Sequence, residues 1–240
     1  MKKIFFLLIT TAGFVACKKN NMDAPAAPAN TSGKIKTWVS GATITTYTYD
    51  AQGRVIVEAN SDGSGYEYEY LTGIVNEKQF NAGHVLNVTY KNELNADGLV
   101  IRKTASNNAA YEELYTYNAD KTEAKQIGHY SGGITQVIDY YYSNDNCDSS
   151  RFSGNSGVWS LTIQRTYYPD KLNSIASENQ GEFFYGKDNA NLQKTEIYKY
   201  SDGSTNTPTT FTYEFDTNGR VVKQTGTQGN NINIGIFSYY

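Results

Sequence analysis

The stretch Tyr-Thr-Tyr-Asp-Ala-Gln-Gly-Arg-Val at residues 47–55 returns with five of its nine residues unchanged as Tyr-Glu-Phe-Asp-Thr-Asn-Gly-Arg-Val at residues 213–221. In both copies large aromatic side chains alternate with other residues before an Asp-x-x-Gly sequence. Alternation with a period of two is the pattern of a β-strand with one buried face. The Asp side chain accepts backbone N–H bonds, and Gly adopts the left-handed conformation that closes a hairpin. Each stretch therefore predicts a strand, a tight turn and an antiparallel return strand.

The turn recurs along the chain with an almost regular spacing. Each copy begins with Asp or Asn and most end with Gly: Asp50 to Gly53, Asn95 to Gly98, Asn118 to Lys121, Asp188 to Asn191, and Asp216 to Gly219. Their separations are close to multiples of about 24 residues, which indicates an internal repeat. Because Lys121 stands where Gly is favoured, we expect it to be the most strained residue of the set.

Weaker turn signals complete the repeat. On the same phase we expect turns at residues 71–73, 143–146 and 168–171, and the opposite ends of the hairpins include a turn at residues 178–181. Together these signals predict an all-β antiparallel meander of about 17 strands, built from tandem β-hairpins, without a helical segment. The aromatic-bearing faces are Thr45-Tyr47-Tyr49, Glu113-Tyr115-Tyr117 and Phe211-Tyr213-Phe215.

Residues 47–55 and 213–221 resemble the YD repeat of RHS-type proteins, in which tandem hairpins build long curving sheets. The chain also resembles an uncharacterised bacterial lipoprotein family whose domain is described as porin-like. The resemblance covers most of residues 34–240 and implies a sheet curled into a porin-like barrel or half-barrel. It implies no active site, since the shared residues make turns and strands. About 16 strands would enclose a lumen too wide for side chains to fill, unless the barrel flattened into a sandwich.

The N-terminus has the pattern of an export signal. A basic start precedes an apolar run over residues 4–15, which is shorter than the ~20 residues of a membrane-spanning helix. Ala16-Cys17 then resembles the lipobox of bacterial lipoproteins, although Phe14 stands where Leu is usual. The resemblance implies that Cys17 is lipidated and begins the mature chain. An ordinary signal, cleaved near Ala12 or Ala16, is the alternative.

This interpretation divides the chain into a signal peptide (1–16), a lipidated Cys with a flexible tether (17–33) and a YD-like β-hairpin repeat domain (34–240). The expected partner is a membrane, to which the lipid would anchor the protein. The expected location is the outer membrane, at its periplasmic face or on the cell surface. The net charge of −3 and the lack of a basic patch argue against nucleic acid as a partner.

No constellation of residues predicts catalysis, a metal or a cofactor. His84 and His129 each follow a Gly near a turn, without a supporting nucleophile. Cys147 lies in an acidic stretch that would raise a thiol pKa, and no second mature Cys is present to pair with it. The carboxylates of that stretch lack the spacing of an EF-hand loop. The pairs Glu67/Glu69 and Glu112/Glu113 are more typical of solvated strand surface than of a glycosidase. We therefore predict that the chain is not an enzyme.

The 21 tyrosines are the remaining candidates for function. Tyr suits half-buried strand faces, so packing explains most of them, but an aromatic wall could also bind sugars or peptides. Tyr140, Tyr141 and Tyr142 are consecutive and cannot all face one side, so at least one should be exposed. We therefore expect a non-catalytic envelope lipoprotein that binds a glycan or peptide on an aromatic sheet face. The alternatives are a structural envelope component that assembles through sheet edges and, least favoured, an unrecognised hydrolase.

Overall fold

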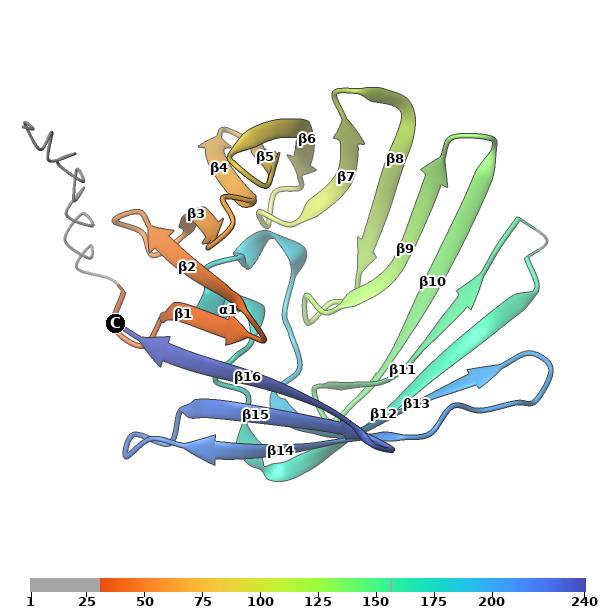
Figure 1. The fold of residues 1–240 in the computed structure, drawn as a ribbon. Helices are drawn as coiled ribbons and strands as arrows, with labels where there is room; N and C mark the ends of the chain where they lie inside the picture. Colours follow the sequence, from red (N-terminus) through yellow and green to blue (C-terminus); the bar gives the residue numbers. More distant parts are fainter. Residues whose placement is uncertain (1–30, 156) are drawn as a thin grey trace, which may run out of the picture.

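A computed structural model describes residues 31–155 and 157–240. The predicted signal peptide, Cys17 and nearly all of the predicted tether lie outside the described residues. Figure 1 shows the described chain as strands that follow one another around a single barrel. Within the described residues no helix is long and apolar enough to cross a membrane.

Sixteen strands follow in chain order. They are β1 (Ile35–Ser40), β2 (Thr43–Tyr49), β3 (Val55–Asn60), β4 (Gly65–Leu71), β5 (Ile74–Asn81), β6 (Val85–Leu94), β7 (Val100–Ala105), β8 (Asn108–Tyr117), β9 (Glu123–Tyr130), β10 (Ile134–Ser143), β11 (Asn146–Ser153), β12 (Trp159–Leu172), β13 (Asn191–Tyr200), β14 (Thr209–Phe215), β15 (Val221–Gln228) and β16 (Asn231–Tyr239). Each pairs antiparallel with its sequence neighbours, and β1 pairs with β16 to close the barrel. The all-β meander and the porin-like barrel are confirmed, with one strand fewer than the approximate prediction.

The short turns form as the sequence predicts. In the first copy the N–H groups of Gln52 and Arg54 both donate to the Asp50 carboxylate at 2.9 Å, and Gly53 has a φ of 77°. The Asp216 turn repeats these bonds and ends at Gly219 with the same φ, and the Asn95 turn ends at Gly98 with a φ of 80°. Lys121 closes its turn at a φ of 72° without the freedom of Gly, which confirms the strain predicted for it.

The predicted aromatic faces line the inside of the barrel. Tyr47, Tyr49 and Tyr115 are each at most 8% exposed and belong to one buried cluster. Glu113 shares the parity of Tyr115 and is also buried, at 9% exposure. The interpretation of Glu113 as solvated surface is therefore wrong, because it lies on the inner face, whereas its neighbour Glu112 pairs with Arg102 at 2.6 Å on the outer face.

The repeat is interrupted between β12 and β13. Residues 173–190 leave the wall and form a helical turn, α1 (Ser177–Gln180), and a 3-10 turn, η1 (Phe183–Tyr185). The turns predicted at residues 168–171 and 178–181 are wrong, because β12 continues through the first and α1 contains most of the second. Asp188 begins no hairpin turn either, since its carboxylate accepts the N–H of Ser177 at 3.1 Å inside the insertion.

Candidate functional site

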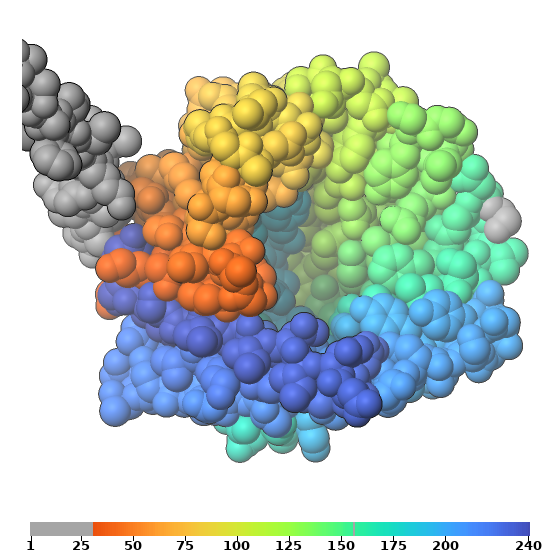
Figure 2. All heavy atoms as spheres, in the orientation of Figure 1, coloured from red at the N-terminus to blue at the C-terminus, as the bar shows by residue number. Residues whose placement is uncertain are grey.

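The barrel encloses a hollow that the insertion closes at one end. Figure 2 shows the hollow bounded by N-terminal, central and C-terminal strands, with the blue-green atoms of the insertion visible at depth. We call residues 173–190 the floor. The floor lies at the end that carries the chain termini and the Asp-x-x-Gly turns, because it bonds to several of those turns.

Backbone contacts fix the floor at points far apart around the barrel. The N–H of Val55 donates to the carbonyl of Gly181 at 3.2 Å, and the N–H of Lys187 donates to the carbonyl of Lys121 at 2.9 Å. A Cβ on Gly181 would come within 2.6 Å of the Val55 nitrogen, and one on Gly186 within 2.6 Å of the Lys121 oxygen. The two glycines are therefore what allow the floor to approach the turns so closely.

The floor contributes an aromatic side chain, Phe184, to the core and a hydroxyl group, that of Tyr185, to a buried polar network. Phe184 is 3% exposed and packs its ring against those of Tyr68 and Tyr70. The hydroxyl of Tyr185 donates to Glu77 at 3.2 Å, and the ammonium of Lys103 donates to both, at 3.0 Å to Glu77 and 2.9 Å to Tyr185. This buried ion pair ties the floor to β5 and β7.

Further carboxyl groups on the inner face have no cation at hydrogen-bond distance within the part of the chain that the structure describes. Glu182 accepts a bond from the Tyr68 hydroxyl at 2.9 Å, and burial raises its pKa. Burial, together with the charges of Glu182 and Glu77, raises the pKa of Glu58 to about 7. Burial and the charge of Glu113 likewise raise the pKa of Glu123 to about 7. Glu58 and Glu123 are therefore partly protonated near neutral pH and can both donate and accept hydrogen bonds.

A band of half-buried tyrosines shares the inner face of the barrel with the carboxyl groups. Its members are Tyr66 on β4, Tyr90 on β6, Tyr111 on β8 and Tyr130 on β9, and we call it the tyrosine band. The ring centroids of Tyr90 and Tyr111 are 5.5 Å apart, and those of Tyr111 and Tyr130 are 5.6 Å apart. Glu113 lies beneath them and accepts the hydroxyl of Tyr130 at 3.2 Å. The band thus offers ring faces and polar atoms to the same space.

A second aromatic surface lies where β1 meets β16. The rings of Trp38 and Phe237 are parallel within 2°, with centroids 6.3 Å apart. With Tyr47 they line a cavity of 140 Å³ that also contacts Ile175 and Gln180 of the floor. Trp38 remains 38% exposed inside the barrel, so it can contact a ligand in the lumen.

The predicted Tyr140-Tyr141-Tyr142 site is divided between the two faces of β10. The three residues line a cavity of 530 Å³ together with residues of the β8–β9 turn. Tyr141 is 47% exposed and lies near Arg151, while Tyr140 and Tyr142 are half-buried. At least one is exposed, as expected. Their role in ligand binding stays a prediction, and no motif in the sequence distinguishes the tyrosine band or Trp38 from the other aromatic residues.

The other polar candidates have structural settings. Cys147 is buried without a disulfide, and burial raises its pKa, with a smaller contribution from Asp148. His84 is exposed and stacks on Phe80, and His129 bonds Thr135 at 3.2 Å. No group of His, Cys, Asp and Glu among the described residues could hold a metal ion.

Comparisons with known proteins agree on the fold. The chain is similar to the crystal structure of a porin-like protein from Bacteroides uniformis, with a TM-score of 0.64 and 15% identity over 88% of this chain and 99% of that one. A porin-like protein from Bacteroides vulgatus gives a TM-score of 0.59 and 12% identity over 86% and 99%. No protein-family model and no curated protein matches the chain. The porin-like β-domain is therefore supported, whereas the likeness to the YD repeat stays a prediction.

Proposed function

We propose that this protein is a non-catalytic barrel of the cell envelope that binds a glycan in its lumen. The observation that carries the proposal is a lumen closed at one end by the floor and lined by exposed aromatic rings beside carboxyl groups. A barrel of this size leaves an interior that its wall side chains do not fill. Because the floor is bonded to the barrel turns, it covers the end of the interior that carries those turns.

The chemistry of the wall suits sugars. A pyranose ring presents C–H groups on its faces and hydroxyls around its edge, so it stacks on aromatic rings while bonding to polar groups beside them. Tyr90 and Tyr111 provide such rings, with the Glu113 carboxyl group beside Tyr111, and Glu58 lies opposite Tyr66 on the neighbouring strand. A basic peptide is the second candidate, because among the described residues the inner-face carboxyl groups outnumber the inner-face cations, Lys103 and Arg165. These carboxyl groups are Glu58, Glu77, Glu113, Glu123, Glu182 and Glu196.

The outer face of the barrel supports a water-facing protein. Across β6, β7 and β8 it carries a network in which Glu93 pairs with Lys91 and Arg102, and Arg102 pairs with Glu112. Charged side chains at the level of the lipid tails would destabilise a membrane-embedded barrel. The envelope location thus rests on the predicted lipid at Cys17, with the barrel held beside the membrane. Within the described residues every strand has a partner on both sides, although β13 and β14 pair only at Thr195–Thr210 and Glu196–Thr209, so the ring offers little free edge for assembly.

Tryptophan fluorescence can test the proposal, since Trp38 faces the lumen and Trp159 begins β12 at the open end. A panel of oligosaccharides that represents envelope, host and plant glycans is titrated into the mature protein and into the Trp159→Phe variant. We expect a saturable change in the Trp38 signal for at least one glycan. We expect Tyr111→Ala to weaken that binding about tenfold, as loss of one stacked ring would.

Tyr141→Ala is the matched control, because it removes an exposed ring from the outer face of β10. It should leave binding unchanged. No binding of any glycan at millimolar concentration would refute the proposal. Binding that depends on Tyr141 but not on Tyr111 would instead place the site on the aromatic sheet face predicted from the sequence. Binding of basic peptides alone would favour the second candidate.

A further inference from the structure

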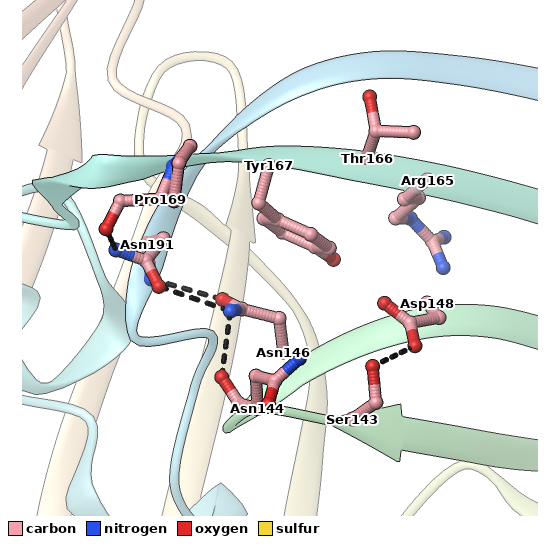
Figure 3. Close-up of a pocket in the computed structure, with 9 residues that line it drawn as sticks. All are labelled: Ser143, Asn144, Asn146, Asp148, Arg165, Thr166, Tyr167, Pro169 and Asn191. Atoms are coloured by element: carbon pink, nitrogen blue, oxygen red, sulfur yellow. Dashed lines mark hydrogen bonds between the residues drawn. The ribbon is translucent and has the colours of Figure 1, made fainter.

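The barrel wall has a lateral opening between β11 and β12. Backbone pairing of these strands runs as far as Ser149 with Gln164, and the strands then separate toward the floor end. The separation leaves a cavity of 390 Å³, which we call the slot. Figure 3 shows Ser143, Asn146 and Asp148 on one side of it and Arg165 and Tyr167 on the other.

The slot lies at a gap between two strands and is lined by residues of both faces of the sheet. Arg165 belongs to the inner face, where its guanidinium donates to Glu196 at 3.1 Å and to the buried Ser150 at 3.2 Å. Thr166, the next residue, is exposed and also lines the slot. Successive side chains of a strand point to opposite faces of the sheet. Because β11 and β12 are not paired beyond Ser149 and Gln164, residues of both faces border the gap.

Fixed polar bridges hold the slot open. Asn146 and Asn191 bond reciprocally, from side chain to side chain at 3.0 Å and from the Asn191 N–H to the Asn146 oxygen at 2.9 Å. The Tyr167 hydroxyl donates to the carbonyl of Cys147 at 2.7 Å, and Asn189 of the floor accepts the Cys147 N–H at 2.7 Å. These bonds replace the missing strand pairing, so the slot is a built feature of the wall.

Three polar groups that line the slot retain unused capacity. Among the described residues no partner contacts Asp148 Oδ1, Arg165 Nη2 or the Asn144 side-chain amide, whereas Asp148 Oδ2 accepts a bond from Ser143. The Asp148 oxygen can accept a hydrogen bond, the Arg165 guanidinium can donate one, and the Asn144 amide can do both. Tyr167 and Pro169 add apolar surface to the same cavity. Apolar surface with a few convergent polar groups is the usual composition of a small-molecule site.

We propose that the slot binds one neutral sugar residue, either free or at the end of a longer glycan. A hydroxyl of the sugar donates to Asp148, another accepts from Arg165, and a C–H face rests on Tyr167 and Pro169. The local charges favour a neutral ligand, because Glu196 already balances Arg165 while Asp148 repels an acidic sugar. The volume of 390 Å³ lies within the range of small-molecule pockets and accommodates one sugar residue. The inference does not depend on the lumen site.

Nitrogen-detected NMR of the side chains tests the slot directly. Methyl glycosides of neutral hexoses and pentoses are titrated into the mature protein, and the Arg165 Nε–H and Asn144 amide signals are followed. We expect saturable shifts of both signals. Asp148→Asn keeps the shape of the side chain but removes its charge, so we expect it to weaken binding about tenfold or more. Asp139→Asn is the matched control, since Asp139 pairs with Lys125 on the outer face of β10, away from the slot.

The outcomes separate the slot from the lumen. No shift at either signal with high-millimolar glycosides, or equal affinity in the Asp148→Asn variant, would overturn the inference. Shifts confined to the Trp38 indole would overturn it while supporting glycan binding in the lumen. Binding of a zwitterion such as glycine in place of the glycosides would overturn the proposed ligand class. Slot binding without any change at Trp38 would support the inference even if the lumen proposal failed.

Discussion

Replacing Glu123 with glutamine should stabilise the barrel at pH 8 and change its stability little at pH 5. Burial and the charge of Glu113 raise the pKa of Glu123 from 4.5 to about 7, and its Oε1 atom is buried without a hydrogen-bond partner. Between these two pKa values the folded state binds a proton that the unfolded state has lost. The free energy of unfolding therefore falls as the pH rises through this window. Well above pH 7 the full penalty is present, at most about 3.4 kcal/mol for a shift of this size.

The assay is urea denaturation of the mature wild-type protein and the Glu123→Gln variant at pH 5 and pH 8. The variant should gain about 1–3 kcal/mol relative to wild type at pH 8 and much less at pH 5, because glutamine is never charged. Glu58→Gln should behave in the same way, since the pKa of Glu58 is also raised to about 7. Glu69→Gln, on the exposed face of β4, should show no such pH dependence. An equal effect of Glu123→Gln at both pH values would refute the electrostatic reasoning.

Three further substitutions test the turn and the floor. Lys121→Gly should raise the free energy of unfolding by about 0.5–1 kcal/mol, because Gly adopts the φ of 72° without strain; a lower urea midpoint would contradict this. Phe184→Ala should cost about 3–5 kcal/mol in calorimetry because it empties a site that is 3% exposed, whereas Phe183→Ala, at 42% exposure, should cost far less. Gly186→Ala should speed hydrogen exchange in η1, since its Cβ would meet the Lys121 carbonyl; unchanged protection would argue against a tightly docked floor.

The regular part of the fold could be predicted because its signals are local. Asp50 and Asp216 bond to backbone N–H groups within their own turns, and Gly53 and Gly219 close those turns, so no distant contact was needed. Alternation along each strand then fixed which side chains share a face. The parity of Glu113 with Tyr115 was also visible in the sequence. That parity indicated the inner face for Glu113. We nevertheless interpreted Glu113 as solvated, because most strand carboxylates are solvated.

The floor could not be predicted because its stability comes from contacts distant in the sequence. The Phe183-Phe184-Tyr185 run fits a strand as well as a 3-10 turn when considered alone. Phe184 is buried only because β4 supplies the rings of Tyr68 and Tyr70, more than 110 residues earlier in the chain. The two glycines that flank the run, Gly181 and Gly186, were the available signal. Their close approach to the Val55 and Lys121 turns becomes meaningful only once the barrel has closed.

The abundance of tyrosine has two explanations, and the structure separates them by position along the barrel. At the floor end the hydroxyls of Tyr49, Tyr70, Tyr117, Tyr213 and Tyr239 donate to backbone carbonyls of the preceding strands at 2.5–2.8 Å. These tyrosines lock one hairpin to the previous one, so the repeat itself requires them. The tyrosine band makes no such bond to the backbone. Its hydroxyls contact lumenal side chains such as Gln79 and Glu113, and its rings stay half-exposed. Packing therefore accounts for the first group, whereas the second retains aromatic surface that faces the lumen and that the barrel itself leaves partly exposed.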